Sequence, residues 1–289
     1  MRSSLPLYLP GANGVQLAAT SFGEGSNGVV VLAHGAGQTR HSWRNAGNEL
    51  ASSGWQVLTI DTRGHGESEW PSDGDYSIDT LKEDLSIVAT RLTESHGCKP
   101  VLVGASLGGI TGLLVEGESS ASVFESLVLV DITPRIDNTG VERIIEFMRR
   151  YEQGFASLEE AAAAVAAYKT GSRPRNPSNV AAQSTGLKKN LRRGQDGRYY
   201  WHWDPRLMDH IGTIDDHFYQ RQSDAAQKLT LPVLLVRGQQ SEIVSRDAVT
   251  EFLELVPHAR YTDIEDAAHM VAGDSNDVFI QSVLDFIGC

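Results

Sequence analysis

Residues 100–109 read Pro-Val-Leu-Val-Gly-Ala-Ser-Leu-Gly-Gly, and this stretch decides the fold. The apolar run Pro100–Val103 predicts a buried strand, and the residues after Ser106 predict a helix. A tight turn between the two needs small neighbours, which Gly104 and Gly108 supply two positions to either side of the serine. Such a turn strains the backbone of its central residue and exposes the side chain at the carboxyl edge of the sheet. We therefore expect Ser106 to be a nucleophile.

The segments on both sides of this turn alternate between strand and helix patterns. Short apolar runs of the kind buried in parallel strands are separated by stretches whose apolar residues recur at helical spacing. The alternation predicts an α/β fold with a mostly parallel sheet covered by helices on both faces. The eight expected strands are Leu5–Leu9, Val15–Thr20, Val29–Ala33, Trp55–Ile60, Pro100–Val103, Ser126–Asp131, Leu231–Val236 and Arg260–Ile264.

Residues 133–228 differ from the rest of the chain. They contain helical stretches at Thr139–Gln153, Leu158–Lys169 and Pro177–Asn190 and no convincing strand. Their net charge is +3, whereas the remainder of the chain carries −15. We therefore expect an inserted helical subdomain at 133–228 and a core made of residues 1–132 and 229–289.

The composition excludes several classes of protein. The 289-residue chain is 40% apolar and carries a net charge of −12, which disfavours nucleic acid and anionic membrane surfaces as partners. It has no apolar run of 18 residues and no stretch that reads as a secretion signal. Its two cysteines give neither a disulfide framework nor metal-ligand spacing. We expect a cytoplasmic protein, monomeric or homodimeric, that acts on a small molecule without a metal or cofactor.

A serine nucleophile needs a base, and His269 is the best placed of the nine histidines. It follows the last expected strand, in a loop that opens at the same edge of the sheet as Ser106. The other strand-following histidines, His34 and His65, stand in glycine-rich contexts that indicate an architectural role.

The base in turn needs a carboxylate that holds its tautomer. Glu242, in the loop after Leu231–Val236, is the favoured candidate. Asp131, at the end of the preceding strand, is the alternative. The carboxylates nearer His269 are interpreted as loop-capping or solvated side chains; they are Asp263, Glu265 and Asp266.

Stabilising the negative charge of a transition state needs two hydrogen-bond donors near Ser106. The amide of Leu107 begins the helix after the turn and points at the same place. The amide of Ala36, in the loop His34-Gly35-Ala36-Gly37 after the first parallel strand, is the second expected donor. This loop matches neither the Gly-x-Gly-x-x-Gly pattern nor a phosphate-binding lysine loop, which disfavours a nucleotide site.

These residues resemble those of the α/β-hydrolase superfamily. The resemblance covers 1–132 and 229–289, and the insert lies where such enzymes carry a helical cap. Within the superfamily the chain is similar to the esterase, lactonase and cofactor-free haloperoxidase-like group. The matching pieces are the His34-Gly35 loop, the segment Asp-Thr-Arg-Gly-His-Gly-Glu-Ser at 61–68, the Gly104–Gly109 turn, the acid near 242 and His269, with serine, acid and histidine in the superfamily's order.

The resemblance implies a catalytic triad and an oxyanion hole. The implied nucleophile is Ser106, the base His269, the orienting acid Glu242, and the oxyanion donors Leu107 and Ala36. Because the superfamily more often has Asp where Glu242 stands, Asp131 stays open as the acid. Related epoxide hydrolases and haloalkane dehalogenases place Asp at the turn, so Ser106 argues against both.

The expected reaction is hydrolysis of a carboxylic ester or lactone through an acyl-enzyme. The alternatives are carbon–carbon bond hydrolysis of a diketone-like acid and a non-catalytic ligand receptor on the same fold. Trp201 and Trp203, in the densest aromatic stretch, are candidates for lining a substrate pocket, or for packing between cap and core. Trp43 is a third candidate, at the entrance.

Overall fold

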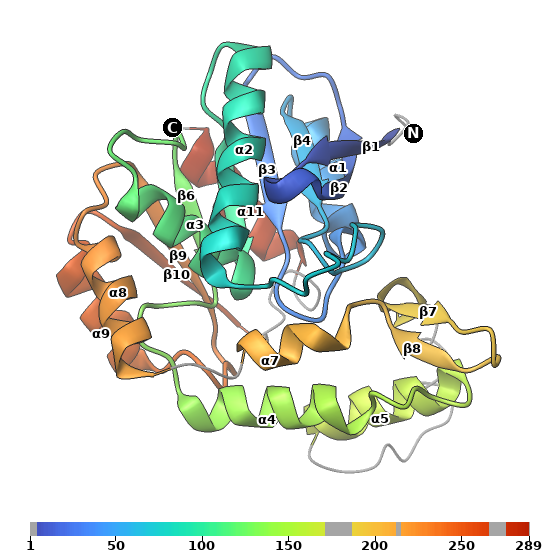
Figure 1. Cartoon of the computed structure of the whole chain (residues 1–289). Coiled ribbons are helices and arrows are strands. Elements are labelled where there is room, and N and C mark those ends of the chain that lie inside the picture. Colours follow the sequence, from blue (N-terminus) through green and yellow to red (C-terminus); the bar gives the residue numbers. More distant parts are fainter. Residues whose placement is uncertain (1–4, 171–186, 212–214, 266–275, 289) are drawn as a thin grey trace.

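A single eight-stranded sheet forms the centre of the protein. The computed structural model describes residues 5–170, 187–211, 215–265 and 276–288. The strands of the sheet are β1 (Leu5–Pro10), β2 (Gln16–Phe22), β3 (Val29–Ala33), β4 (Gln56–Ile60), β5 (Val101–Ala105), β6 (Leu127–Val130), β9 (Val233–Gly238) and β10 (Arg260–Ile264). Their order is β1-β2-β4-β3-β5-β6-β9-β10 (Figure 1). Only the β1–β2 and β2–β4 pairs are antiparallel. The predicted mostly parallel, eight-stranded sheet is confirmed.

Helices cover both faces of this sheet. One hydrophobic cluster joins the sheet to α2, α3, α8 and α9, and a second joins the opposite face to α1 and α11. The bounds are α1 (Arg44–Ser52), α2 (Ile78–His96), α3 (Leu107–Glu118), α8 (Asp216–Ala226), α9 (Arg246–Leu255) and α11 (Asn276–Ile287). Short 3-10 turns lie at Ala12–Gly14, Arg40–Trp43, Lys188–Asn190 and Pro205–Leu207.

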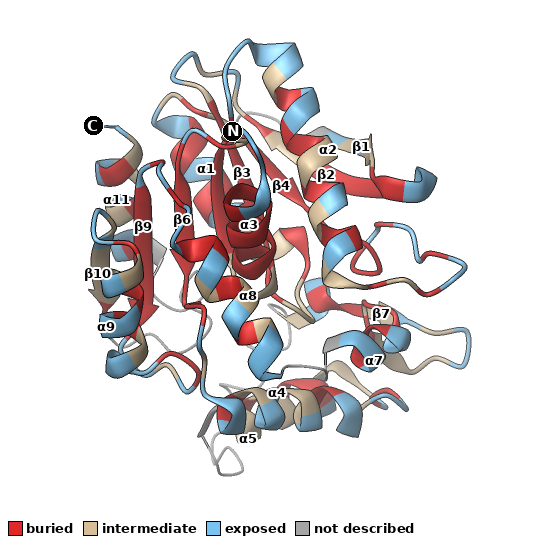
Figure 2. Cartoon of the chain, turned by 60° about the vertical axis from the view of Figure 1, so that its left-hand side comes forward, coloured by how far each residue is buried: buried red, intermediate tan, exposed pale blue. Residues whose placement is uncertain are grey.

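The apolar strands are buried because both faces of the sheet are covered. Along β3, Val29 and Val31 pack on one side, and Val30 and Leu32 pack on the other. This explains why the central strands are continuous apolar runs rather than alternating ones. Helix α3, which starts directly after Ser106, is likewise buried over most of its length between the sheet and its neighbouring helices (Figure 2).

Residues 133–170 and 187–211 form a separate layer at one end of the sheet (Figure 1). This layer, called the cap below, contains α4 (Asn138–Arg150), α5 (Leu158–Thr170), β7 (Leu191–Arg193), β8 (Tyr199–Trp201) and α7 (Met208–Ile211). It has its own hydrophobic cluster, to which the core contributes Tyr76. Helix α8 falls inside the expected insert 133–228 but packs against α3 of the core. The division at 133 and 228 stays a prediction.

The expectation that the insert contains no strand is wrong. Strands β7 and β8 form an antiparallel hairpin in which Leu191 pairs with Trp201. Strands of three residues are too short to show an alternating pattern of apolar and polar residues. The sequence signal that could have revealed this hairpin is the turn at 194–198, where Gly197 has a φ of 82°. The helix expected at Pro177–Asn190 lies outside the described residues, apart from its last positions.

Candidate active site

Ser106 occupies a strained turn between β5 and α3. Its φ is 46° and its ψ is −115°, a conformation that a residue with a side chain rarely adopts. A Cβ atom on Gly104 would lie 2.6 Å from the carbonyl oxygen of Gly108, and one on Gly108 would lie 2.6 Å from that of Ala33. These glycines are therefore needed for helix α3 to approach the sheet so closely, and the turn has the geometry that the sequence predicts.

The loop after β3 lies against the Ser106 side chain. A Cβ atom on Gly35 would be 3.1 Å from the Cβ of Ser106 and 3.7 Å from its Oγ. The expected donor Ala36 follows Gly35 directly. The expected donor Leu107 is the first residue of α3, where amides have no acceptor within the helix. The structure thus brings Ser106 and both expected oxyanion donors to the same edge of the sheet.

Two buried histidines hold this loop. Nδ1 of His34 is 2.8 Å from the carbonyl oxygen of Gly35, and its Nε2 accepts the amide of Thr62 at 3.1 Å. Nε2 of His65 accepts the amide of Gly37 at 3.2 Å, and its Nδ1 is 3.1 Å from the carbonyl oxygen of Arg63. Because a carbonyl can only accept, each imidazole carries its proton on Nδ1 and is neutral.

Burial keeps these imidazoles neutral. The rings of His34 and His65 are fully buried and meet edge to face, with centroids 5.0 Å apart. Desolvation lowers the pKa of His34 to about 4. Desolvation and the neighbouring His34 lower the pKa of His65 to about 3. The architectural interpretation of these residues agrees with their surroundings, whereas sequence reasoning missed their contacts with Gly35 and Gly37 in the loop 34–37.

Asp131 is a rigid, buried carboxylate one residue beyond β6. Its Oδ1 accepts the amide of Gly238 at 3.1 Å, and its Oδ2 accepts the hydroxyl of Ser241 at 2.6 Å. Among described non-glycine residues only Asn13, Ser106 and Asp131 have a positive φ. Two of these three strained positions are thus neighbours on adjacent strands, since Ala105 pairs with Val130. Backbone strain of this kind concentrates at functional sites.

The Glu242 side chain forms an ion pair with a helix of the cap. Its Oε2 is 3.1 Å from Nη1 of Arg143 on α4, and its side chain is 41% exposed. Helix α4 packs tightly on this loop, because a Cβ atom on Gly140 would overlap the carbonyl oxygen of Glu242. In this structure the Glu242 carboxylate joins the core to the cap.

The expected base, His269, lies outside the described residues, as does Asp266. Asp263 is engaged with its own strand and with β9. Its Oδ1 accepts the hydroxyl of Tyr261 at 2.5 Å and lies 3.1 Å from Nη1 of Arg237. Glu265 is exposed, at the end of the described part of this loop.

The three candidate tryptophans are buried. Trp201 and Trp203 belong to the hydrophobic cluster of the cap. Trp43 packs against Phe279 of α11, with ring centroids 5.9 Å apart. Of the three, Trp203 approaches the loop beside Ser106. A Cβ atom built on Gly37 would lie 3.8 Å from Nε1 of Trp203. The Sδ and Cε atoms of Met148 lie close to the same position. Trp203 thus packs between cap and core, next to the loop 34–37.

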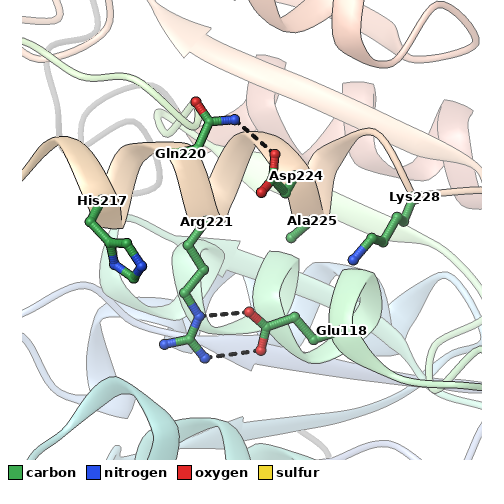
Figure 3. Close-up of a pocket in the computed structure, with 7 residues that line it drawn as sticks. All are labelled: Glu118, His217, Gln220, Arg221, Asp224, Ala225 and Lys228. Atoms are coloured by element: carbon green, nitrogen blue, oxygen red, sulfur yellow. Dashed lines mark hydrogen bonds and ion pairs between the residues drawn. The ribbon is translucent and has the colours of Figure 1, made fainter.

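A separate pocket, of about 230 Å³, lies at the far end of α3 (Figure 3). Arg221 of α8 reaches across it to Glu118 of α3, with an Nε–Oε1 distance of 2.6 Å, and also pairs with Asp79 of α2. Because α3 has 12 residues, this pocket is a full helix length, roughly 18 Å, from Ser106. We interpret its ion pairs as fastening α8 to the core.

The described ranges contain no helix that combines the length and apolarity needed to cross a membrane. Within the same ranges, no three His, Cys, Asp or Glu side chains are grouped as they would be to hold a metal ion.

The family model described as alpha/beta hydrolase fold matches residues 28–275, which is most of the chain. The protein belongs to this family. The resemblance inferred from the sequence is therefore confirmed, and the protein is an enzyme of the α/β-hydrolase fold.

Similar α/β-hydrolases include esterase Rv0045c of Mycobacterium tuberculosis, which is 30% identical over 286 residues, or 95% of this chain and 88% of the relative. The 3-hydroxybutyrate-oligomer hydrolase of Cupriavidus necator is 25% identical over 272 residues, or 88% of this chain and 87% of the relative. Among solved structures, E-2-(acetamidomethylene)succinate hydrolase has a TM-score of 0.82 at 20% identity and covers 99% of this chain and 100% of its own. That last likeness shows the fold alone.

Proposed function

We propose that this α/β-hydrolase cleaves a carboxylic ester or lactone of a small-molecule substrate through an acyl-enzyme on Ser106. The observation that carries the proposal is the strained Ser106 at the start of α3, with the loop 34–37 against its side chain. Similarity to esterase Rv0045c over 95% of the chain supports the ester class. We also propose a cytoplasmic location, since two cysteines in 289 residues are too few for the disulfide framework of a secreted protein.

In the proposed mechanism, His269 accepts the proton of Ser106 as its Oγ attacks the substrate carbonyl. The amides of Ala36 and Leu107 stabilise the oxyanion that forms, and the leaving group takes the proton from His269. A water molecule activated by the same histidine then hydrolyses the acyl-enzyme and regenerates Ser106.

We propose Asp131 as the acid that orients His269, in place of the favoured sequence candidate Glu242. Three observations support this choice. Asp131 is buried, and its carboxylate accepts two hydrogen bonds. It directly follows β6, the strand that pairs with β5. Because Ala105 pairs with Val130, Asp131 and Ser106 stand at equivalent positions, one residue beyond the two strands. Glu242 is half-exposed, and its carboxylate pairs with the cap residue Arg143.

Turnover of short p-nitrophenyl esters and lactones by the wild-type protein and by Ser106→Ala tests the proposal. We expect activity to fall by about 10³-fold or more, because the nucleophile is removed. A serine-directed fluorophosphonate should label the wild-type protein at Ser106 only, as mapped by peptide mass spectrometry. Retained activity in Ser106→Ala, or an adduct on another residue, contradicts the nucleophile. A substrate panel in which only diketone-like acids are cleaved contradicts the ester class.

A further inference from the structure

The backbone on both sides of Ala36 is fixed by one imidazole each. The carbonyl of Gly35 belongs to the same peptide plane as the amide of Ala36, and it faces Nδ1 of His34 at 2.8 Å. The amide of Gly37 belongs to the next plane and donates to Nε2 of His65 at 3.2 Å. Because a peptide unit is planar and trans, fixing the direction of its carbonyl oxygen fixes its N–H in the opposite direction.

Each imidazole is itself anchored at its other nitrogen. Nε2 of His34 accepts the amide of Thr62, and Nδ1 of His65 donates to the carbonyl of Arg63. Thr62 and Arg63 are consecutive residues in the loop after β4, so both rings are fixed to one segment of the core. Neither ring has a second orientation that satisfies both of its contacts, because a 180° flip would put Cδ2 and Cε1 where Nδ1 and Nε2 now stand.

The cap closes over this arrangement from the other side. The amide of Gly66 donates to the carbonyl of His202 at 2.7 Å, and the amide of Asp204 donates to that of Gly64 at 2.8 Å. His65 and Trp203 lie opposite each other in this antiparallel bridge. The indole of Trp203 and the end of Met148 also lie against Gly37. The cap is thus hydrogen-bonded to the turn that carries His65.

From these contacts we infer that His34 and His65, as neutral Nδ1–H imidazoles, are the positioning residues of the oxyanion hole. His34 sets the direction of the Ala36 N–H, and His65 fixes the adjoining peptide plane and links it to the cap. The inference rests on the proposed function, since the Ala36 amide matters only if an oxyanion forms beside Ser106. Both rings are fully buried, so in this proposal they act on the substrate only through the loop 34–37.

His34 contacts the loop 34–37 through Nδ1, whereas His65 contacts it through Nε2. The same substitution should therefore have opposite effects at the two positions, which we call the crossed test. An Asn side chain can place its NH₂ near the former Nδ1, and a Gln side chain can place its carbonyl near the former Nε2. His34→Asn keeps the donor to Gly35, whereas His34→Gln loses it. His65→Gln keeps the acceptor for Gly37, whereas His65→Asn loses it.

We therefore expect His34→Asn to be more active than His34→Gln, and His65→Gln to be more active than His65→Asn. The less active member of each pair should lose about 10- to 100-fold in kcat with KM nearly unchanged, because an oxyanion donor acts in the transition state. Affinity for a boronic acid that adds to Ser106 should fall in parallel with kcat. A role in packing alone predicts the same order at both positions, so equal or uncrossed losses overturn the inference.

A measurement on the wild-type protein tests the inference without any variant. Nitrogen-15 chemical shifts of the histidine side chains at pH 7 should include two imidazoles protonated on Nδ1 alone whose signals disappear one each in His34→Asn and His65→Gln. His269, which the proposed mechanism places in the same tautomer beside Asp131, should keep its signal in both variants. Protonation on Nε2 in either ring overturns the assignment. If Ser106→Ala keeps full activity, the proposed function fails first. If Ser106→Ala is inactive and the crossed order is absent, only this inference fails.

Discussion

Ser106 and Asp131 both have a positive φ, which is a strained value for a residue with a side chain. Both have a positive φ of about 50° and both directly follow a buried parallel strand. Strain of order 1–3 kcal/mol at such a residue persists only where the surroundings fix it. Here the amide of Ser106 donates to Val130 and that of Asp131 donates to Val236, so each turn is held by the next strand of the sheet.

At this scale the test of the triad acid is a comparison of two isosteric substitutions. Asp131→Asn should lower kcat by about 10³-fold or more, because an amide in place of the carboxylate cannot stabilise the imidazolium. Glu242→Gln should lower it less than about threefold, since its carboxylate pairs with Arg143. The steady-state rate on one ester, with thermal melting as a control for folding, decides between them. The reverse order returns the acid to Glu242.

Local patterns predicted the tight strand-to-helix turn that carries Ser106, but they could not rank the candidate acids. The turn at Ser106 depends on Gly104 and Gly108, which lie two positions away in the sequence. The surroundings of Glu242 depend on Arg143, which lies about a hundred positions away on another element. The hydrogen bond between His65 and Gly37 likewise joins residues that are far apart in the sequence. The motif around His65 therefore predicted only an architectural role.

Among the elements, buried strands and long amphipathic helices were the most predictable. All eight expected strands occur, with ends shifted by a few residues, because covered parallel strands leave continuous apolar runs. The hairpin of β7 and β8 was missed because three residues cannot establish a period. It is held by its pairing and by Phe155, whose backbone bridges to Tyr199.

The contact between α3 and α8 gives a prediction at the scale of elements. Arg221, and to a smaller extent Lys82, lower the pKa of Glu118 to about 2, so the Arg221–Glu118 pair stabilises the fold at neutral pH. Arg221→Gln should reduce the free energy of unfolding by no more than about 1 kcal/mol, since the pair is partly solvated. Hydrolase activity should not change, because the pair is a helix length from Ser106. Urea unfolding at low and high salt provides the measurement.

The pH dependence of this loss follows from the lowered pKa of Glu118. A carboxylate whose folded pKa is depressed contributes stability above its unfolded pKa of 4.5 and loses that contribution as the pH falls towards 2. The difference between wild type and Arg221→Gln should therefore shrink below pH 4.5. A difference that grows on acidification contradicts the assignment.

For the whole molecule, the two neutral histidines set a limit on acid stability. Their folded pKa values of about 4 and about 3 lie below the unfolded value of 6.5. Between these values the unfolded chain binds protons that the folded protein does not, so stability falls as the pH falls from 6.5. Because a tenfold difference in proton affinity between the two states is worth about 1.4 kcal/mol, the combined loss amounts to several kcal/mol.

We expect the urea midpoint at pH 4.5 to be clearly lower than at pH 7. The double variant His34→Asn/His65→Gln should show a flatter dependence, because its amides do not titrate. An equal decline in wild type and double variant would mean that other groups cause it. Activity below pH 6 should be measured on protein shown to be folded, so that unfolding is separated from titration of the base.

The ion pair between Glu242 and Arg143 has a consequence for how this enzyme can be re-engineered. On the proposed assignment, the strand next to β5 supplies the acid, and the loop after β9 is left to anchor α4. Chemistry and substrate choice then reside in different, separately replaceable parts. A cap from another hydrolase could be grafted by redesigning two sets of contacts. These are the Glu242–Arg143 ion pair and the backbone hydrogen bonds that join Gly64 and Gly66 to the cap, while Ser106 and Asp131 keep their positions.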